Sequence, residues 1–146
     1  MTKAYIALGS NIGDRQKHIG LGISWLEKIG RITPSPLIVE TNDESGLGPP
    51  YLNTVVELDT PIPDPKRLLE ECLRIELACG RERPDAPNAP RALDLDLIIV
   101  DGWIGNLEWD TPDDLLCLGP LLTLTLPHPR AGQRAFVQEP LKALVQ

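Results

Sequence analysis

The sequence is poor in aromatic side chains, in basic side chains and in long apolar runs. Aromatic residues make up 4% of its 146 residues, and 14 Lys and Arg stand against 21 Asp and Glu, a formal net charge of −7. A protein of this charge repels a nucleic-acid backbone, so we predict no nucleic-acid partner. The longest apolar run, Leu115 to Leu126, is interrupted by Gly119-Pro120 and is too short for a bilayer, so we predict no membrane association. An anionic ligand then requires a local basic cluster.

Cysteine is also scarce. Cys72, Cys79 and Cys117 are odd in number and show neither Cys-x-x-Cys nor Cys/His spacing. This pattern excludes a disulfide framework and a structural zinc site. The apolar stretch Ala4 to Gly9 is too short for a signal peptide. We therefore expect buried, reduced thiols in a cytoplasmic protein.

Proline is abundant, with fifteen residues gathered in a few clusters. Because proline fixes φ and lacks an N–H donor, these clusters predict ordered connections rather than helices or strands. A chain of this length buries about 70% of its unfolded surface as one unit. We therefore expect a single domain over residues 1–146.

Apolar patterning predicts two amphipathic helices between short strands. The first helix starts at a cap on Ser10 or Asn11 and ends at Gly30, and the second starts at Asp64-Pro65 and ends at Gly80. This alternation predicts an α+β fold, a ferredoxin-like α/β sandwich with a mainly antiparallel sheet and helices packed on it. Strands are expected at residues 3–8, 36–40, 51–58, 94–100 and 123–126, with a last short helix at 139–145.

Two aspartates in the fourth of these strands are the first candidate site. Side chains alternate along a strand, so Asp94 and Asp96 share one face, and Leu95, Leu97 and Ile99 share the other. Two carboxylates about 7 Å apart along a strand repel each other unless a cation lies between them. Oxygen ligands of this kind favour magnesium. A solvated strand end explains an isolated Asp-x-Asp pair equally well.

Arginines are concentrated in two segments of this acidic chain. Their planar guanidinium groups bind phosphate through paired hydrogen bonds. Beside a carboxylate pair that holds a divalent cation, such a cluster predicts a magnesium–polyphosphate site. The alternative is ordinary pairing with neighbouring glutamates, which is the better explanation for Arg74 and Arg130 taken alone. The arginines are Arg74, Arg81, Arg83, Arg91, Arg130 and Arg134.

Two of the few aromatic residues lie beside expected loops. Tyr51 follows Pro49-Pro50, and Phe136 follows Arg134. They could enclose a flat heterocycle, with Asn53 on the same strand face as Tyr51 to offer a donor and an acceptor. Core packing explains them equally well. No Gly-x-x-x-x-Gly-Lys-Ser/Thr motif is present, so the chain is not a P-loop enzyme.

Taken together, these segments resemble the 6-hydroxymethyl-7,8-dihydropterin pyrophosphokinase family of folate biosynthesis. The matching motifs occur in the family's order over nearly the whole chain. The most specific are the opening Gly-Ser-Asn-Ile-Gly-Asp and the Arg91 to Asp96 segment. The motifs are Tyr5 to Asp14, Tyr51 to Asn53, Leu68 to Leu69, Arg74 to Glu76, Gly80 to Arg83, Pro90 to Asp96, Pro127 to His128, Arg134 to Phe136 and Pro140 to Leu141.

The resemblance implies transfer of pyrophosphate from ATP to the hydroxymethyl group of the pterin, with release of AMP. It implies ATP as co-substrate and two Mg²⁺ ions held by Asp94 and Asp96. The pterin would be bound by Thr41, Tyr51, Asn53 and Phe136. Catalysis would also use Arg81, Arg83 and Arg91, and the nucleotide would contact Glu76, Arg91, His128 and Arg134.

The chain departs from the family pattern mainly around the nucleotide. Asn88 and Ala89 stand where an aromatic residue and a glycine commonly precede Pro-Arg. Leu73, Thr123 and Pro129 replace a polar, a basic and an aromatic residue. These differences bear on ATP affinity and rate rather than on the type of reaction.

Residues 109–122 resemble an insertion into the family pattern. We expect this apolar segment to pack over the sheet edge in a monomer, and the alternative is a weak dimer through residues 109–126. Two other functions stay open: a paralogue with another pterin or nucleotide substrate, and a binding module without turnover that uses the segment as an interface.

Overall fold

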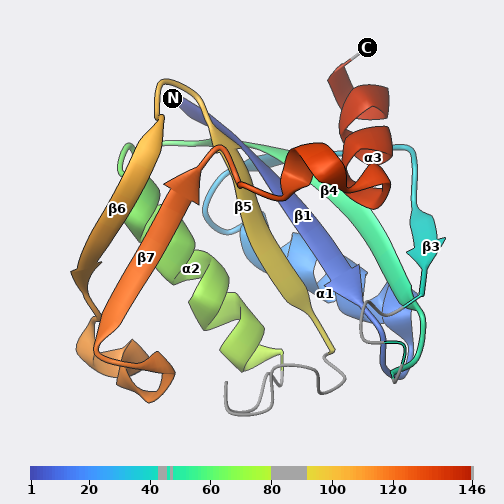
Figure 1. Cartoon of the computed structure of the whole chain (residues 1–146), viewed down its shortest axis with the longest axis horizontal. Coiled ribbons are helices and arrows are strands. Elements are labelled where there is room, and N and C mark those ends of the chain that lie inside the picture. Colours follow the sequence, from blue (N-terminus) through green and yellow to red (C-terminus); the bar gives the residue numbers. More distant parts are fainter. Residues whose placement is uncertain (43–45, 47, 80–91, 146) are drawn as a thin grey trace.

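The antiparallel sheet has β1 (Thr2–Ser10) in its middle, between β4 (Tyr51–Thr60) and β5 (Asp94–Val100). Two short strands, β2 (Arg31–Pro34) and β3 (Val39–Thr41), pair in succession with the outer edge of β4. With helices after β1 and β4, this strand order is the predicted ferredoxin-like α+β arrangement, which is confirmed (Figure 1). The computed structural model describes residues 1–42, 46, 48–79 and 92–145.

The outer edge of the sheet is divided because of its prolines. The prediction placed one strand at 36–40, but β3 begins at Val39, and β2 was not predicted. Proline lacks the N–H that a continuous ladder needs. Between the two strands, Ser35 N still donates to the Val55 carbonyl at 2.9 Å, and Thr54 Oγ1 donates to the Leu37 carbonyl at 2.9 Å.

The first helix, α1 (Arg15–Leu26), begins later and ends earlier than predicted. Asp14 is its N-cap, and its carboxylate accepts the N–H of Lys17 at 3.2 Å. Gly13 has φ +65°, a conformation that a helix cannot contain, so neither Ser10 nor Asn11 can be the cap. Gly30 lies beyond the end of the helix.

The second helix, α2 (Pro65–Ala78), starts as predicted with Asp64 as its N-cap. The Asp64 carboxylate accepts the N–H of Lys66 at 2.9 Å, and Pro65 occupies the first turn, where its missing donor costs nothing. Cys79 is the C-cap, and Gly80 lies outside the described residues. No helix in the described ranges combines the length and apolar character that a bilayer span requires.

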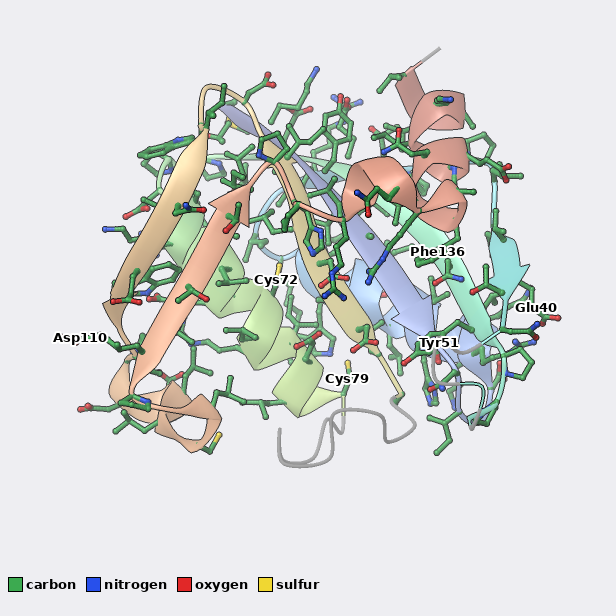
Figure 2. The ribbon with its side chains drawn as sticks, in the orientation of Figure 1. Glu40, Tyr51, Cys72, Cys79, Asp110 and Phe136 are labelled. Atoms are coloured by element: carbon green, nitrogen blue, oxygen red, sulfur yellow. The ribbon has the colours of Figure 1, made fainter. Side chains whose placement is uncertain are left out.

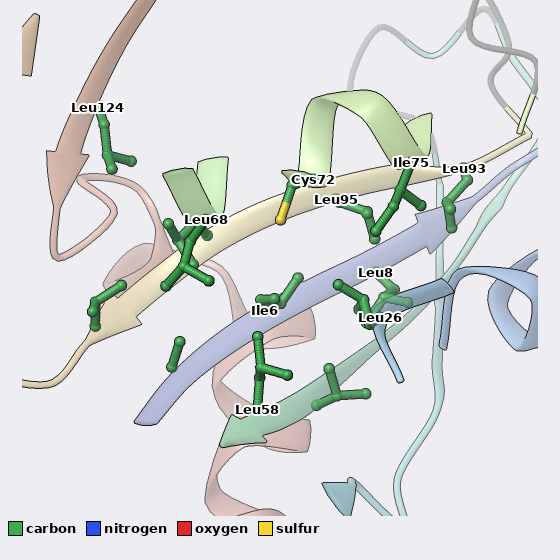
Figure 3. Packing of buried hydrophobic residues seen from close by; sticks show 14 of the residues in the cluster. Ile6, Leu8, Leu26, Leu58, Leu68, Cys72, Ile75, Leu93, Leu95 and Leu124 are labelled. Carbon is green, nitrogen blue, oxygen red and sulfur yellow. The ribbon is translucent and has the colours of Figure 1, made fainter. Parts of the chain in front are cut away.

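Both helices pack on one face of the sheet and bury the larger hydrophobic cluster there (Figure 3). Close packing of this kind is the main source of stability in a small domain. Fully buried side chains include Ile6, Leu8, Leu26, Leu58, Leu68, Leu93 and Leu97.

The opposite face of the sheet is covered only in part, by α3 (Ala135–Val145) and the short 3₁₀ helix η2 (Ala131–Gln133) (Figure 1). The helix α3 starts earlier than the predicted residue 139. A smaller cluster lies between these two helices and the sheet, formed by Val55, Ile98, Ala131 and Val137.

A β-bulge changes the direction of side chains along β5. Two consecutive residues of β1 pair with Ile99 and Leu97, so that Ile98 has no counterpart. Both Ile98 and Ile99 then pack on the cluster beneath α3. The prediction that Ile99 shares a face with Leu97 is therefore wrong. The two aspartates precede the bulge and keep a common face.

A second, two-stranded sheet lies beside β5 and consists of β6 (Gly105–Asp110) and β7 (Leu121–Leu126) (Figure 1). Sequence patterning predicted part of β7 but not β6. Residues of β7 alternate between buried and exposed, so one side of the hairpin contributes Leu122, Leu124 and Leu126 to the interior.

The segment predicted as an insertion, residues 109–122, is held against α2 by side-chain hydrogen bonds. Trp109 Nε1 donates to Glu70 Oε2 at 2.9 Å, and Arg74 Nε donates to Asp114 Oδ2 at 2.7 Å. The 3₁₀ helix η1 (Asp113–Leu118) between the two strands has one side chain, Leu115, fully buried. Exposed apolar surface also remains in this segment, at Leu116 and Leu121.

Candidate active site

The candidate site lies on the sheet face that α3 covers only in part. Val39, Asn53, Gly9 and Asp94 form one row across β3, β4, β1 and β5. Residues directly opposite one another in antiparallel strands project to the same side. Asp96 is two residues further along β5 and therefore projects with Asp94. The sheet thus brings the predicted carboxylates and the predicted amide to one surface.

Tyr51, two residues before Asn53 on β4, reaches across the central strand to the Asp94 end of this row. Its hydroxyl donates to Asp94 Oδ2 at 3.2 Å, although one strand lies between β4 and β5. A Cβ atom on Gly9 would lie 3.4 Å from Cδ1 of Tyr51 and 3.3 Å from Oδ1 of Asn53. The missing side chain of Gly9 therefore leaves room for the tyrosine ring and the amide over the central strand.

Gly9 was not among the predicted site residues, although it lies in the opening motif, Tyr5 to Asp14, that resembles the family. A glycine within a strand often marks a place where another group approaches closely. That signal was present in the sequence.

Thr41 and Asn53 form one hydrogen-bonded unit. Asn53 is 7% exposed, and its Nδ2 donates to the Val39 carbonyl at 3.1 Å and to Thr41 Oγ1 at 3.0 Å. Both amide protons are therefore used within the protein. The carboxamide oxygen of Asn53 is left as its acceptor, and the Thr41 hydroxyl, which accepts from Asn53, keeps its own proton to donate.

Phe136 and Arg134 come from the segment that leads into α3. Phe136 is half-buried against the smaller cluster, on the same sheet face as Tyr51, and both rings lie on the same flank of the sheet (Figure 2). The guanidinium carbon of Arg134 lies 5.6 Å from the centre of the Phe136 ring, within the range of a cation–π interaction. A cation is thus placed beside the aromatic group.

His128 is held by its backbone and by one ring nitrogen. Its N–H donates to the carbonyl of Ile98 at 2.8 Å, at the bulge of β5. Its Nδ1 accepts the N–H of Arg130 at 3.2 Å. With Nδ1 as an acceptor, the neutral ring carries its proton on Nε2, which can donate to a ligand.

The donor set at Asp94 and Asp96 fits a hard divalent cation. Asp94 is half-buried and Asp96 is exposed, and both supply carboxylate oxygens on one face. The described residues contain no group of three or more His, Cys, Asp or Glu side chains suited to a metal. Magnesium is commonly held by one or two carboxylates together with phosphate oxygens and water, so two protein ligands are sufficient.

Glu76 lies on the other side of the sheet, where it supports β5. It is 3% exposed, and its Oε2 accepts the N–H of Leu95 at 2.7 Å. Leu95 separates the two aspartates in the sequence. Glu76 therefore contacts the backbone of the carboxylate strand, and its predicted contact with nucleotide stays a prediction.

The predicted arginine cluster is only partly within the described residues. Arg81, Arg83 and Arg91 lie outside them. Arg74 forms ion pairs with Asp114 and with Glu71, and its Nη1 lies 2.8 Å from Glu71 Oε1. These acidic partners raise the pKa of Arg74. The simpler explanation of Arg74 as a structural ion-pairing residue is thus supported.

The three cysteines are free thiols and differ in exposure. Cys72 is buried within the core, and burial raises its pKa; burial likewise raises the pKa of Cys79. Cys117 is exposed, so the expectation that all three thiols are buried is wrong. Its position on the outer side of η1 was not predicted.

The fold and this surface together define the class: a ferredoxin-like α+β protein with a polar site on the sheet face opposite its helix pair. A family model described as 7,8-dihydro-6-hydroxymethylpterin-pyrophosphokinase matches residues 5–146. The chain belongs to this family.

Individual relatives agree with this assignment. The chain is 35% identical to a 2-amino-4-hydroxy-6-hydroxymethyldihydropteridine pyrophosphokinase of Bacillus subtilis, over 98% of this chain and 78% of that protein. It is 33% identical to the folic acid synthesis protein fol1 of Schizosaccharomyces pombe, over 97% of this chain and 18% of that protein.

A solved structure supports the fold. A crystal structure described as HPPK-DHPS in complex with substrates superposes with a TM-score of 0.75 at 13% sequence identity. The superposition covers 99% of this chain and 40% of that chain. At this identity the likeness concerns the fold alone.

Proposed function

We propose that the protein transfers the pyrophosphoryl group of ATP to the hydroxymethyl group of 6-hydroxymethyl-7,8-dihydropterin and releases AMP, as a step of folate biosynthesis. It is an ATP-dependent diphosphotransferase, and ATP is its co-substrate. One observation carries the proposal furthest: the sheet presents Asp94, Asp96, Tyr51 and Asn53 on one face. A hydrogen bond joins the aromatic end to the carboxylate end.

The pterin would lie between Tyr51 and Phe136. Stacking on aromatic faces suits a flat heterocycle, because it buries both faces of the ring without requiring hydrogen bonds. The edge of the ring would then be recognised by the Thr41 hydroxyl as a donor and by the Asn53 carboxamide oxygen as an acceptor. Since Asn53 gives both amide protons to β3, it would contact the pterin without moving.

The triphosphate would lie over Asp94 and Asp96. Two magnesium ions held there would neutralise charge on the phosphate oxygens. On the protein side, Asp94 and Asp96 would fix the position of the nucleotide relative to the pterin. His128 Nε2–H and the Arg134 guanidinium would donate to phosphate oxygens. We also propose that Arg81, Arg83 and Arg91 act on the transferred group.

In the reaction, the hydroxymethyl oxygen bonds to the β-phosphorus while the bond from that phosphorus to the α,β-bridging oxygen breaks. The pyrophosphoryl group moves to the pterin, AMP leaves, and the hydroxyl proton passes to solvent. Positioning and charge stabilisation account for most of the rate in such transfers. The residues on the α3-side face supply both, so no side chain is required as a general base.

An assay of AMP release with hydroxymethyl-dihydropterin, ATP and Mg²⁺ tests this function. We expect turnover in the parent protein and a loss of about 10³-fold in Asp94→Asn, the order found when a main electrostatic stabiliser of a transition state is removed. Asp110→Asn, an exposed carboxylate on β6, is the matched control. Tight pterin binding without AMP in the parent protein would refute the proposal and indicate a binding module.

Three further features are proposals. We propose a single domain over residues 1–146, with residues 109–122 as an insertion fastened to α2. We propose a monomer, and the exposed side chains of Leu116 and Leu121 are where a weak dimer through residues 109–126 would form. Light scattering across a concentration series separates the two. We propose action in the cytoplasm, whose reducing conditions suit three free thiols.

A further inference from the structure

Arg15, the first residue of α1, lies between the end of β3 and the beginning of β4. Its Nη2 lies 2.7 Å from Oε2 of Glu40, and its Nη1 donates to the carbonyl of Pro50 at 3.1 Å. Figure 2 shows Glu40 and Tyr51 near one another at this edge of the molecule. One guanidinium group thus contacts two segments that are ten residues apart in the sequence.

Both contacts are adjacent in the sequence to residues of the proposed pterin site. Glu40 precedes Thr41, and Pro50 precedes Tyr51. Thr41 and Tyr51 are directly paired, as the last pair of the β3–β4 ladder. A group that fixes Glu40 and Pro50 relative to each other therefore also fixes the neighbouring pair Thr41 and Tyr51.

The strand β3 needs such support, since it is three residues long and pairs only with β4 in the described part of the chain. Strands this short gain little from their own ladder. Asn53 holds β3 from inside the site, through the Val39 carbonyl and Thr41 Oγ1. Arg15 holds it from outside, through Glu40.

A second side chain holds the start of β4. Asn11 is 2% exposed, and its Nδ2 donates to the Pro49 carbonyl at 3.3 Å. The residues just before Tyr51 are therefore bonded twice, by Asn11 in the turn between β1 and α1 and by Arg15 at the start of α1. Within the described residues, Glu40 is bonded to this part of the chain through Arg15, so a change at Arg15 should release β3 more than β4.

We propose that Arg15 is a positioning residue for pterin recognition: its fork holds Glu40 and the Pro50 carbonyl so that Thr41 and Tyr51 keep the geometry that the pterin requires. This inference rests on the proposed function. A guanidinium is suited to the task because its planar donors reach a carboxylate and a carbonyl at once, whereas a lysine ammonium is a single point charge.

An ordinary surface ion pair is the competing explanation. Such pairs contribute little to stability, and side chains of Arg15 and Glu40 are 30% and 56% exposed. If the pair were only that, its removal would leave ligand binding unchanged. The two explanations therefore differ in pterin affinity rather than in stability.

The experiment compares Arg15→Met with the control Arg31→Met. Arg31 is an exposed arginine at the start of β2 on the same sheet edge, and the described structure shows no ion pair for it. Each variant removes one positive charge and keeps a long side chain. Affinity for 6-hydroxymethylpterin is measured by fluorescence titration in the presence of a non-hydrolysable ATP analogue and Mg²⁺. Affinity for the ATP analogue is measured separately. Amide hydrogen exchange at residues 39–41 is followed by NMR without ligand.

For Arg15→Met we expect pterin affinity to fall about tenfold, the size of one lost charge-assisted hydrogen bond. Nucleotide affinity should be unchanged, and exchange at residues 39–41 should become faster. Arg31→Met should match the parent protein in all three. The pterin affinity of Arg15→Lys should lie between that of Arg15→Met and that of the parent protein. Glu40→Gln keeps an acceptor for the guanidinium group and should retain most of the pterin affinity.

Unchanged pterin affinity and unchanged exchange in Arg15→Met would overturn the inference. Equal losses of pterin and nucleotide affinity would also overturn it, because they would indicate a general effect on folding. If the parent protein binds no pterin, the proposed function fails and this inference fails with it, but faster exchange in Arg15→Met would still establish the contact as a support of β3.

Discussion

The two faces of the central sheet differ in what their side chains do. The face beneath α1 and α2 carries branched apolar side chains that are almost completely buried, such as Leu8 and Leu97. The face toward α3 carries a small residue on the central strand, Gly9, with polar groups on both sides of it. The first face provides stability through packing, and the second leaves room and hydrogen-bonding groups for ligands.

The difference between the faces follows from strand alternation alone. In β4, Asn53 and Val55 face α3, whereas Val56 and Leu58 belong to the larger cluster. The polar residues therefore cost the core nothing, because they lie on the face that the core does not use. Substitutions on the polar face can therefore alter ligand binding without loss of the fold. Substitutions on one face at a time show what each face contributes.

Removal of a core side chain tests whether the face beneath α1 and α2 contributes more to stability than the face toward α3. Leu68 of α2 is fully buried in the larger cluster, and Leu68→Ala should lower the free energy of unfolding by about 3 kcal/mol through loss of burial and a residual cavity. Val137→Ala, on the side of α3 that faces the sheet, should cost about 1.5 kcal/mol, because two methyl groups are lost. Urea unfolding followed by circular dichroism measures both. Equal losses would show that the two faces stabilise the protein to the same extent.

The sequence predicted the second face better than it predicted the edges. Alternation around Asp94 and Asp96 placed both carboxylates correctly, because the strand is regular up to the bulge. The position of Ile99 was wrong, since a bulge depends on pairing with β1, which no local pattern reveals. The strand β6 was missed for a similar reason: its partner β7 lies beyond a connection that holds η1.

The contacts that position the site could be predicted least. Tyr51 reaches Asp94 across a strand, and Arg15 reaches Glu40 and Pro50 from another element. Contacts of this type depend on register and on rotamers, which follow from the complete packing rather than from residue spacing. The sequence indicated which residues could form the proposed site, but not which of them hold the others in place.

A methyl group on the central strand tests whether the face toward α3 needs open space for its ligand. Gly9→Ala would place a Cβ at 3.3 Å from Asn53 Oδ1 and 3.4 Å from Tyr51 Cδ1, so both side chains would have to shift by a few tenths of an ångström. We expect unfolding to change little, since alanine also lowers the entropy of the unfolded chain. Pterin affinity should fall about tenfold, as for one lost hydrogen bond. Fluorescence titration beside urea unfolding gives both values, and a loss of stability with normal affinity would contradict the role of Gly9.

The two tyrosines provide a matched pair on this face. Tyr51 donates to Asp94 at 3.2 Å, and Tyr5 donates to Glu57 at 2.9 Å at the other end of the sheet. Tyr51→Phe keeps the ring but removes its bond to a proposed metal ligand. We expect the Mn²⁺ dissociation constant, measured by electron paramagnetic resonance with an ATP analogue, to rise about threefold to fivefold. Tyr5→Phe should leave that constant unchanged, and a similar rise in both variants would exclude a specific role for Tyr51.

The smallest expected effect is a pH dependence at Tyr5. Burial, together with the hydrogen bond to Glu57 and its negative charge, raises the pKa of Tyr5 from 10.0 to about 12. Between these values the unfolded chain loses the phenol proton while the folded protein keeps it, so stability from this group is complete below pH 10 and declines as the pH rises toward 12. The urea midpoint of Tyr5→Phe should therefore fall less between pH 9.5 and pH 11 than that of the parent protein. The same measurement on Tyr51→Phe gives the comparison for the tyrosine at the ligand end of this face. Identical slopes in Tyr5→Phe and the parent protein would show that the Glu57 pair does not contribute to alkaline unfolding, and that the two ends of this face differ less than their contacts indicate.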